Sequence, residues 1–162
     1  MPAVRYLYVL ALALWLGGMA LAGLVVAPTI FSVLQAWNAS TGRVLAGDLF
    51  GAILARLYII GGAAGALMLA ALTLQRVLGP RPKAYGIRAG VIAVMFALTA
   101  YAGIIIQPRI QALQREVGGS MIELGTDDLR RTEFDGLHRL STTLMSLSIL
   151  GGLALLAWET RE

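Results

Sequence analysis

Four long runs without a charged residue dominate the pattern of apolar and polar positions along this chain. The most apolar part of the first run covers residues 6–34, and the other three cover residues 57–75, 89–107 and 140–158. Each run reaches about the 20 residues that a helix needs to cross the hydrocarbon core of a bilayer. None alternates apolar and polar residues with the period of two that is typical of a barrel strand. The pattern predicts an all-α membrane protein, a bundle of four transmembrane helices.

The connections between these runs differ in kind. Residues 77–86, "VLGPRPKAYG", combine prolines and glycines with cations and predict a tight basic turn. The connection over residues 109–137 is long and carries both signs of charge. Its first part continues the third helix, "GGS" at 118–120 breaks it, and Thr126 is a suitable N-cap for a new helix. We therefore expect helices three and four to extend beyond the bilayer as a charged hairpin.

Composition supports a membrane protein with one transmembrane domain over residues 1–162. The mean hydropathy is +0.77, and 14% of the residues are charged, against about 25% in an average soluble domain. The formal net charge of +4 does not indicate nucleic acid, because arginines that flank spans serve lipid headgroups. The absence of cysteine excludes disulfides and thiolate metal sites.

The distribution of basic residues predicts the orientation. Four spans place both termini and the 76–88 turn on one side, and that turn concentrates cations without an acid. By the positive-inside rule we expect both termini in the cytoplasm and a multi-pass protein of a bacterial inner membrane. The first run continues beyond the length of a signal-peptide core, so we keep it as a span.

Small residues predict how the helices pack. Gly18 with Ala22, and Gly61 with Gly65, have the small-xxx-small spacing that permits close approach of helices within the chain or in a homo-oligomer. On the fourth helix a weakly polar stripe recurs at helical spacing, formed by His138, Ser141, Met145, Ser148 and Gly152. We interpret it as a packing seam, with a polar pathway or ligand pocket as the alternative.

The candidate functional residues lie at one face of the membrane. By the span count Arg56, Arg109 and His138 fall on the same side, at the ends of three different helices. We predict that they form a polar cluster able to attract an anion, with Gln107, Asp135 and Ser141 beside them. In the alternative interpretation each arginine is a separate anchor to headgroups, and His138, the only histidine, is an interfacial cap.

The same residues give little support to catalysis or metal binding. Ser141 lies one helical turn after His138, but no oxyanion donor or free orienting carboxylate is evident, so we assign no catalytic residue. One histidine and scattered methionines do not make the converging ligand set that a metal or haem needs within one chain. We expect no metal site and no cofactor, with haem or copper as the alternative.

Four short stretches resemble the transmembrane protein 205-like family of small four-span membrane proteins, which has no assigned function. They are "WLGGMALAGLVVAPTIF" at 15–31, "DLFGAILARLY" at 48–58, "QPR" at 107–109 and "LHRLST" at 137–142. The chain departs from that pattern at Gly51, where a proline is usual, and at Gln107, where an acid is common. A more distant likeness connects it to copper resistance protein D and to a membrane protoporphyrinogen oxidase that uses haem.

Three classes of function follow. The first is a non-enzymatic accessory or scaffold protein of the membrane, with the bilayer as its partner. The second is a small transporter or channel component acting as an oligomer, and the third is a haem- or metal-dependent membrane enzyme. No ionisable residue lies between the flanking charges of any predicted span. Because intramembrane ionisable groups mark transport pathways and proton relays, their absence favours the first class.

Overall fold

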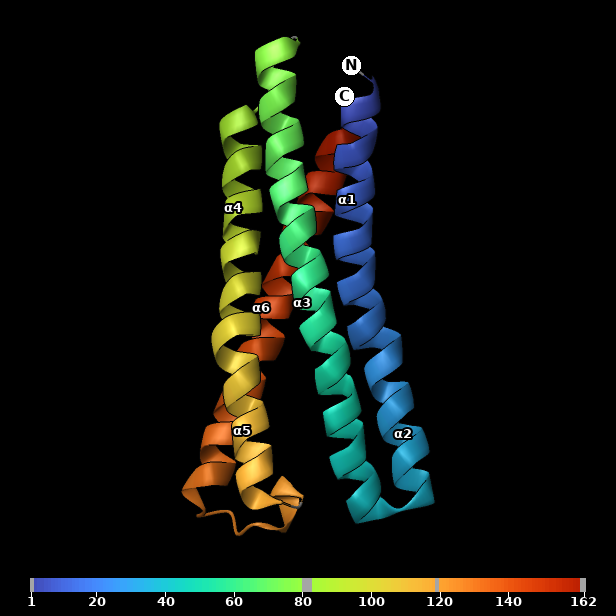
Figure 1. The fold of residues 1–162 in the computed structure, drawn as a ribbon, viewed down its shortest axis with the longest axis vertical. Helices are drawn as coiled ribbons and strands as arrows, with labels where there is room; N and C mark the ends of the chain where they lie inside the picture. The colour runs from blue at the N-terminus through green and yellow to red at the C-terminus, as the bar shows by residue number, and fades with distance from the viewer. Residues whose placement is uncertain (1, 80–82, 119, 161–162) are drawn as a thin grey trace.

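A computed structural model describes residues 2–79, 83–118 and 120–160 of the chain. Within these residues four helical segments are long and apolar enough to cross a membrane, which confirms the predicted all-α, four-helix fold. Successive segments run in opposite directions (Figure 1). Their bounds are α1 (Pro2–Leu21) continued by α2 (Ala27–Trp37), α3 (Ala39–Leu78), α4 (Tyr85–Tyr101) continued by α5 (Gln107–Val117), and α6 (Leu129–Glu159).

Each of the four helical segments is longer than the charge-free run that predicted it. α3 begins where the Asn38 side chain accepts a hydrogen bond from the Thr41 N–H at 3.0 Å. It therefore carries Arg43 and Arg56 before its longest apolar stretch begins. The run over 57–75 covers only the later part of this helix, because a charged side chain interrupts an apolar run without interrupting backbone hydrogen bonds.

The predicted break after the third span is confirmed. α5 ends at Val117, and Gly118 adopts the left-handed conformation (φ 62°) that favours glycine after a helix. A single 3₁₀ turn, η3 (Met121–Glu123), follows. Residues 80–82 of the basic turn, and residue 119, lie outside the described residues. The extension of α5 and α6 beyond the bilayer stays a prediction.

The N-cap of α6 is Asp128, so the prediction of Thr126 as the cap is wrong. The Asp128 carboxylate accepts a hydrogen bond from the Arg130 N–H at 2.8 Å and others from the Arg130 guanidinium. The side-chain hydrogen bond from Arg130 is the largest cause that lowers the pKa of Asp128, to about 2. The carboxylate is therefore ionised at neutral pH, where its charge also suits the positive end of the helix.

The first and third segments contain the same interruption. The motif Ala-Gly-x-x-x-x-Pro begins at Ala22 and again at Ala102. In each copy the residues before the proline form one π-helical turn, η1 (Ala22–Val26) and η2 (Ala102–Ile106). A proline in a helix removes one backbone donor and clashes with the carbonyl four residues earlier. The wider turn accommodates this, and the N–H of the residue before each proline bonds to the first alanine's carbonyl.

Burial follows the same register in both copies. Five of the six buried positions of α1 and η1 match buried positions of α4 and η2 that lie 80 residues later, and Ala11 is the exception. The matched pairs are Tyr8 and Arg88, Leu12 and Ile92, Trp15 and Met95, Met19 and Thr99, and Ala22 and Ala102. The two halves of the chain therefore share one plan, in which a helix with a π turn is followed by a long helix.

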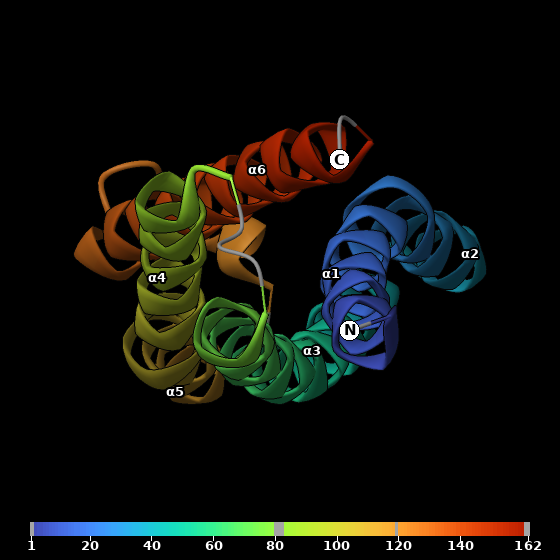
Figure 2. The ribbon, with the colours of Figure 1, turned by 90° about the horizontal axis from the view of Figure 1, so that it is seen from above.

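Glycines make room for large side chains of neighbouring helices. The Trp15 side chain of α1 packs against Gly61 and Gly65 of α3, so an indole ring occupies the space at that small-residue pair. The same role recurs across the bundle, where Met95 contacts Gly151 and Leu16 contacts Gly152. Seen from above, α1, α3, α4 and α6 surround a common centre, and each contacts the next (Figure 2).

The two ends of the bundle differ. The N-terminus, the C-terminus, the end of α3 and the start of α4 lie at one end, and α6 crosses close to α1 there (Figure 1). At the other end α2 and α3 diverge from α5 and α6 (Figure 1). We call these the terminal end and the open end.

A buried ion cluster joins three helices at the terminal end. Arg88 of α4 is 1% exposed, and its guanidinium donates to the Glu159 carboxylate of α6. Arg5 of α1 donates to the other Glu159 oxygen at 3.2 Å, and the Arg88 guanidinium lies 5.0 Å from the Tyr8 ring centre. In the sequence Arg88 and Glu159 look like ordinary charges that flank spans, so this cluster was not predicted.

Candidate functional site

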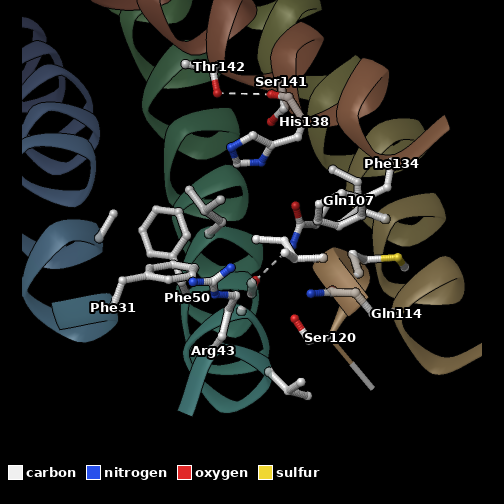
Figure 3. A pocket seen from close by; sticks show the side chains of 18 of the residues that line it. Phe31, Arg43, Phe50, Gln107, Gln114, Ser120, Phe134, His138, Ser141 and Thr142 are labelled. Atoms are coloured by element: carbon white, nitrogen blue, oxygen red, sulfur yellow. Dashed lines mark hydrogen bonds between the residues drawn. The ribbon is translucent and has the colours of Figure 1, made fainter. Parts of the chain in front are cut away.

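A cavity of about 490 Å³ lies at the open end, between α2 and α3 on one side and α5 and α6 on the other (Figure 3). A ligand site typically has about 300–1,000 Å³ and an apolar lining with few polar groups. The apolar part of this lining includes Phe31, Phe50, Leu54, Ile110, Phe134 and Met145. Its polar part comprises Arg43, Gln107, Gln114, Ser120, His138, Ser141 and Thr142. The cavity therefore has the size and the mixed lining of a small-molecule site.

Arg43 is the one cation among the described lining residues, and no acid lines the cavity with it. Its side chain is half-buried on α3, and one guanidinium nitrogen donates to the Gln35 amide oxygen of α2 at 3.1 Å. Within the described part of the chain no carboxylate lies within ion-pair distance of this guanidinium. The cavity thus holds a positive charge whose bonded partner is neutral.

Gln107 connects the two sides of the cavity at the π turn. It directly follows η2, is 5% exposed, and its amide nitrogen donates to the Gly51 carbonyl of α3 at 3.3 Å. A side chain at Gly51 would meet this amide. Gly51 and Gln107 are therefore in contact with each other.

A second polar contact involves Ser141, which lines the cavity. The Ser141 hydroxyl of α6 lies 3.3 Å from the Tyr58 hydroxyl of α3, and both side chains are buried. His138 lies one turn before Ser141 on the cavity wall and stacks on Phe134, with ring centroids 6.1 Å apart. Figure 3 shows His138 and Ser141 on one side of the cavity and Arg43 with Ser120 on the other.

The weakly polar stripe of α6 serves both of its proposed roles. Ser148 and Gly152 are buried in the bundle, where Gly152 contacts Leu16. Met145 and His138 lie nearer the open end and line the cavity. Ser141 is buried and also lines the cavity. The stripe is thus a packing seam over its later part and a cavity wall over its earlier part.

Of the predicted polar cluster, Gln107, His138 and Ser141 line the cavity. Arg109 instead donates two hydrogen bonds to the Glu133 carboxylate, at 2.6 and 2.9 Å. Arg56 donates to the Ala52 carbonyl of its own helix. Asp135 is exposed on α6. Among the described lining residues Arg56, Arg109 and Asp135 are absent. The predicted approach of both arginines to His138 finds no support in these contacts.

Sequence reasoning missed Arg43, which replaces the expected arginines in the lining. A signal was present, because Arg43 is the one charge between residues 6 and 47. Arg43 lies between the first two predicted spans, so it was not among the charges expected to form the site. Arg43 lines the cavity from within α3, because this helix already begins at Ala39.

Metal chemistry has a limited basis in the geometry. Among residues 2–79, 83–118 and 120–160 no three His, Cys, Asp or Glu side chains come together as a metal site would require. The Ser141 hydroxyl is hydrogen-bonded to Tyr58. Tyr58 lies on α3, whereas His138 lies on α6.

The helices and the cavity define a class of protein, a four-helix membrane protein with an apolar cavity between its helix pairs. Residues 10–118 match the family described as a domain of unknown function, DUF4149, and the chain belongs to this family. Comparisons with curated proteins and with solved structures gave no significant match.

Proposed function

We propose that the protein is a non-enzymatic accessory protein of the membrane that holds one apolar or amphipathic molecule in the cavity at the open end. The observation that carries this proposal is the cavity itself, with about 490 Å³ and a lining of aromatic and aliphatic side chains around a few polar groups. Such a lining favours a molecule that partitions from lipid, because burial of its apolar surface drives binding.

The proposal needs no catalytic residue, metal or haem. Phe31, Phe50 and Phe134 supply contact area, and the polar groups orient the ligand. A relationship between this family and the transmembrane protein 205-like proteins is part of the proposal, supported by the four short stretches described above.

A carrier or transporter is the second candidate. It is favoured by the contrast between an end held by the Arg88–Glu159 pair and an end where the helix pairs diverge. A cavity at the interface of two structural repeats is also how many transporters place their substrates. Rocking of the two halves about the terminal end would then open and close the cavity.

A substitution that fills the cavity tests the proposed function. Val44 lines the cavity, whereas Val33 on α2 is 61% exposed and lies outside the described lining. In neutral detergent, Val44→Trp is expected to weaken binding of a fluorescent long-chain polyene, as acid and as alcohol, by about tenfold or more, because the indole occupies the ligand's space. Val33→Trp is the matched control and should bind as the wild type does.

Two results would count against the proposal. One is polyene binding no stronger than to protein-free micelles, and the other is equal binding by the Val44 and Val33 variants. The visible spectrum of the same preparation is expected to lack a haem band. A band near one equivalent per chain would support the haem-dependent alternative instead.

We further propose a bacterial inner-membrane location with both termini in the cytoplasm, and homo-oligomers through small-residue helix faces. Because the chain has no cysteine, Ala3→Cys, Lys83→Cys and Gly125→Cys each introduce a unique label. An impermeant thiol reagent added outside spheroplasts should label the Gly125 variant and spare the other two. Labelling of all three from one side, or the reverse pattern, would reject this orientation.

A further inference from the structure

We propose that the ligand is a single-chain amphiphile with a carboxylate head, a long-chain fatty acid, and that Arg43 binds the head. This inference rests on the proposed function and names its ligand class. It follows from the position of Arg43, the charges around it and the shape of the apolar lining.

The head site is formed by three elements. Arg43 lies on α3, and Gly47 one turn later lies against the Gln114 amide of α5, since a Cβ there would be 2.7 Å from its nitrogen. Ser120, from the connection after α5, is 7% exposed and lines the same side of the cavity (Figure 3). A guanidinium, an amide and a hydroxyl are thus brought together, and all three can donate hydrogen bonds to an anion.

Charge complementarity selects an anion. The acids on the surrounding helices lie outside the described lining, and Glu133 is already bonded to Arg109. A half-buried guanidinium with a neutral partner gains most from a charged acceptor, because charge-assisted hydrogen bonds are about twice as strong as neutral ones. One arginine balances one negative charge, so a monoanion fits better than a dianionic phosphate.

The rest of the cavity fits one apolar chain. From Arg43 the lining continues past Phe50 and Leu54 on α3 to Met145 on α6. Methionine is a flexible side chain that adapts to irregular apolar ligands. The cavity lies within the size range of a site for one drug-sized molecule, which favours a single chain over a lipid with two chains.

The test compares three head groups attached to alkyl chains of the same length. Palmitate, hexadecanol and hexadecyl phosphate compete with the fluorescent polyene alcohol for the full chain in neutral detergent. We expect palmitate to bind about tenfold more tightly than hexadecanol. Arg43→Gln should remove this difference, because it weakens palmitate binding more than hexadecanol binding. Arg139→Gln, an exposed arginine outside the described lining, is the matched control and should keep the difference.

Each of the other outcomes rejects either the carboxylate inference alone or the inference together with the proposed function. Equal binding of palmitate and hexadecanol by the wild type, or a preference that survives Arg43→Gln, rejects the carboxylate inference and leaves the proposed function intact. Tighter binding of hexadecyl phosphate than of palmitate rejects the carboxylate in favour of a phosphate head. Failure of all three to compete, with no effect of Val44→Trp on the polyene, rejects the proposed function and the inference together.

Discussion

Glu159→Gln is expected to lower the free energy of unfolding by about 3–5 kcal/mol, the usual cost of breaking a buried ion pair. The substitution leaves the Arg88 guanidinium, 1% exposed, without its carboxylate. Arg88→Met should cost less, because Glu159 keeps its contact with Arg5 at 3.2 Å. Arg5→Gln should cost least, since Arg5 is 45% exposed and exposed pairs contribute about 0–1 kcal/mol.

This order is checked by reversible unfolding of the three variants in the same detergent. The double variant Arg88→Met with Glu159→Leu is the control for charge, because replacing both partners of a buried pair by apolar residues is often neutral. It should be more stable than Glu159→Gln alone. If Glu159→Gln unfolds within about 1 kcal/mol of the wild type, the pair is solvated and does not hold the terminal end together.

Gly42→Ala is expected to destabilise the hairpin of α2 and α3 by about 1–3 kcal/mol or more. A Cβ at Gly42 would lie 1.9 Å from the Leu34 carbonyl oxygen and 2.5 Å from its carbon. These are backbone atoms, so the two helices must separate to admit one methyl group. Because Arg43 is the next residue, the same movement should also weaken palmitate binding.

Thermal unfolding and the polyene titration measure both effects. Gly62→Ala is the matched control, since a Cβ there meets nothing within 4 Å. In a helix interior that change should be neutral or stabilising by up to about 1 kcal/mol. A Gly42→Ala protein as stable as the Gly62→Ala protein would show that α2 and α3 are not held as closely as the structure places them.

The four helices could be predicted because the length of an apolar run is fixed by the thickness of the bilayer. The small-residue pair Gly61 and Gly65 was also visible in local spacing, although the Trp15 side chain occupies the space there. The start of α3 at Ala39 could not be predicted in this way, since Arg43 and Arg56 end an apolar run without ending a helix. The repeat was visible only at Pro28 and Pro108 and their Ala-Gly partners, because most other matched positions keep burial and change side chain.

The candidate site depended on tertiary contacts that spacing does not show. Gln107, His138 and Ser141 were predicted and line the cavity, whereas Arg109 finds Glu133, 24 positions later, instead of His138. Burial of Arg88 was missed because a charge at the end of a span looks like a headgroup anchor. Its pairing with Glu159, 71 positions later in the chain, offsets the cost of burying this charge.

Photolabelling tests the central claim, that the cavity at the open end holds an amphipathic ligand, most directly. A palmitate analogue with a diazirine near its chain end is activated in the purified protein, and the labelled peptides are mapped. The account predicts labels on cavity residues of α3, α5 and α6, among them Leu54, Ile110 and Met145, which excess palmitate and Val44→Trp both suppress. Labels confined to the exposed outer residues Leu24, Ile59 and Ile104, and insensitive to Val44→Trp, would contradict it.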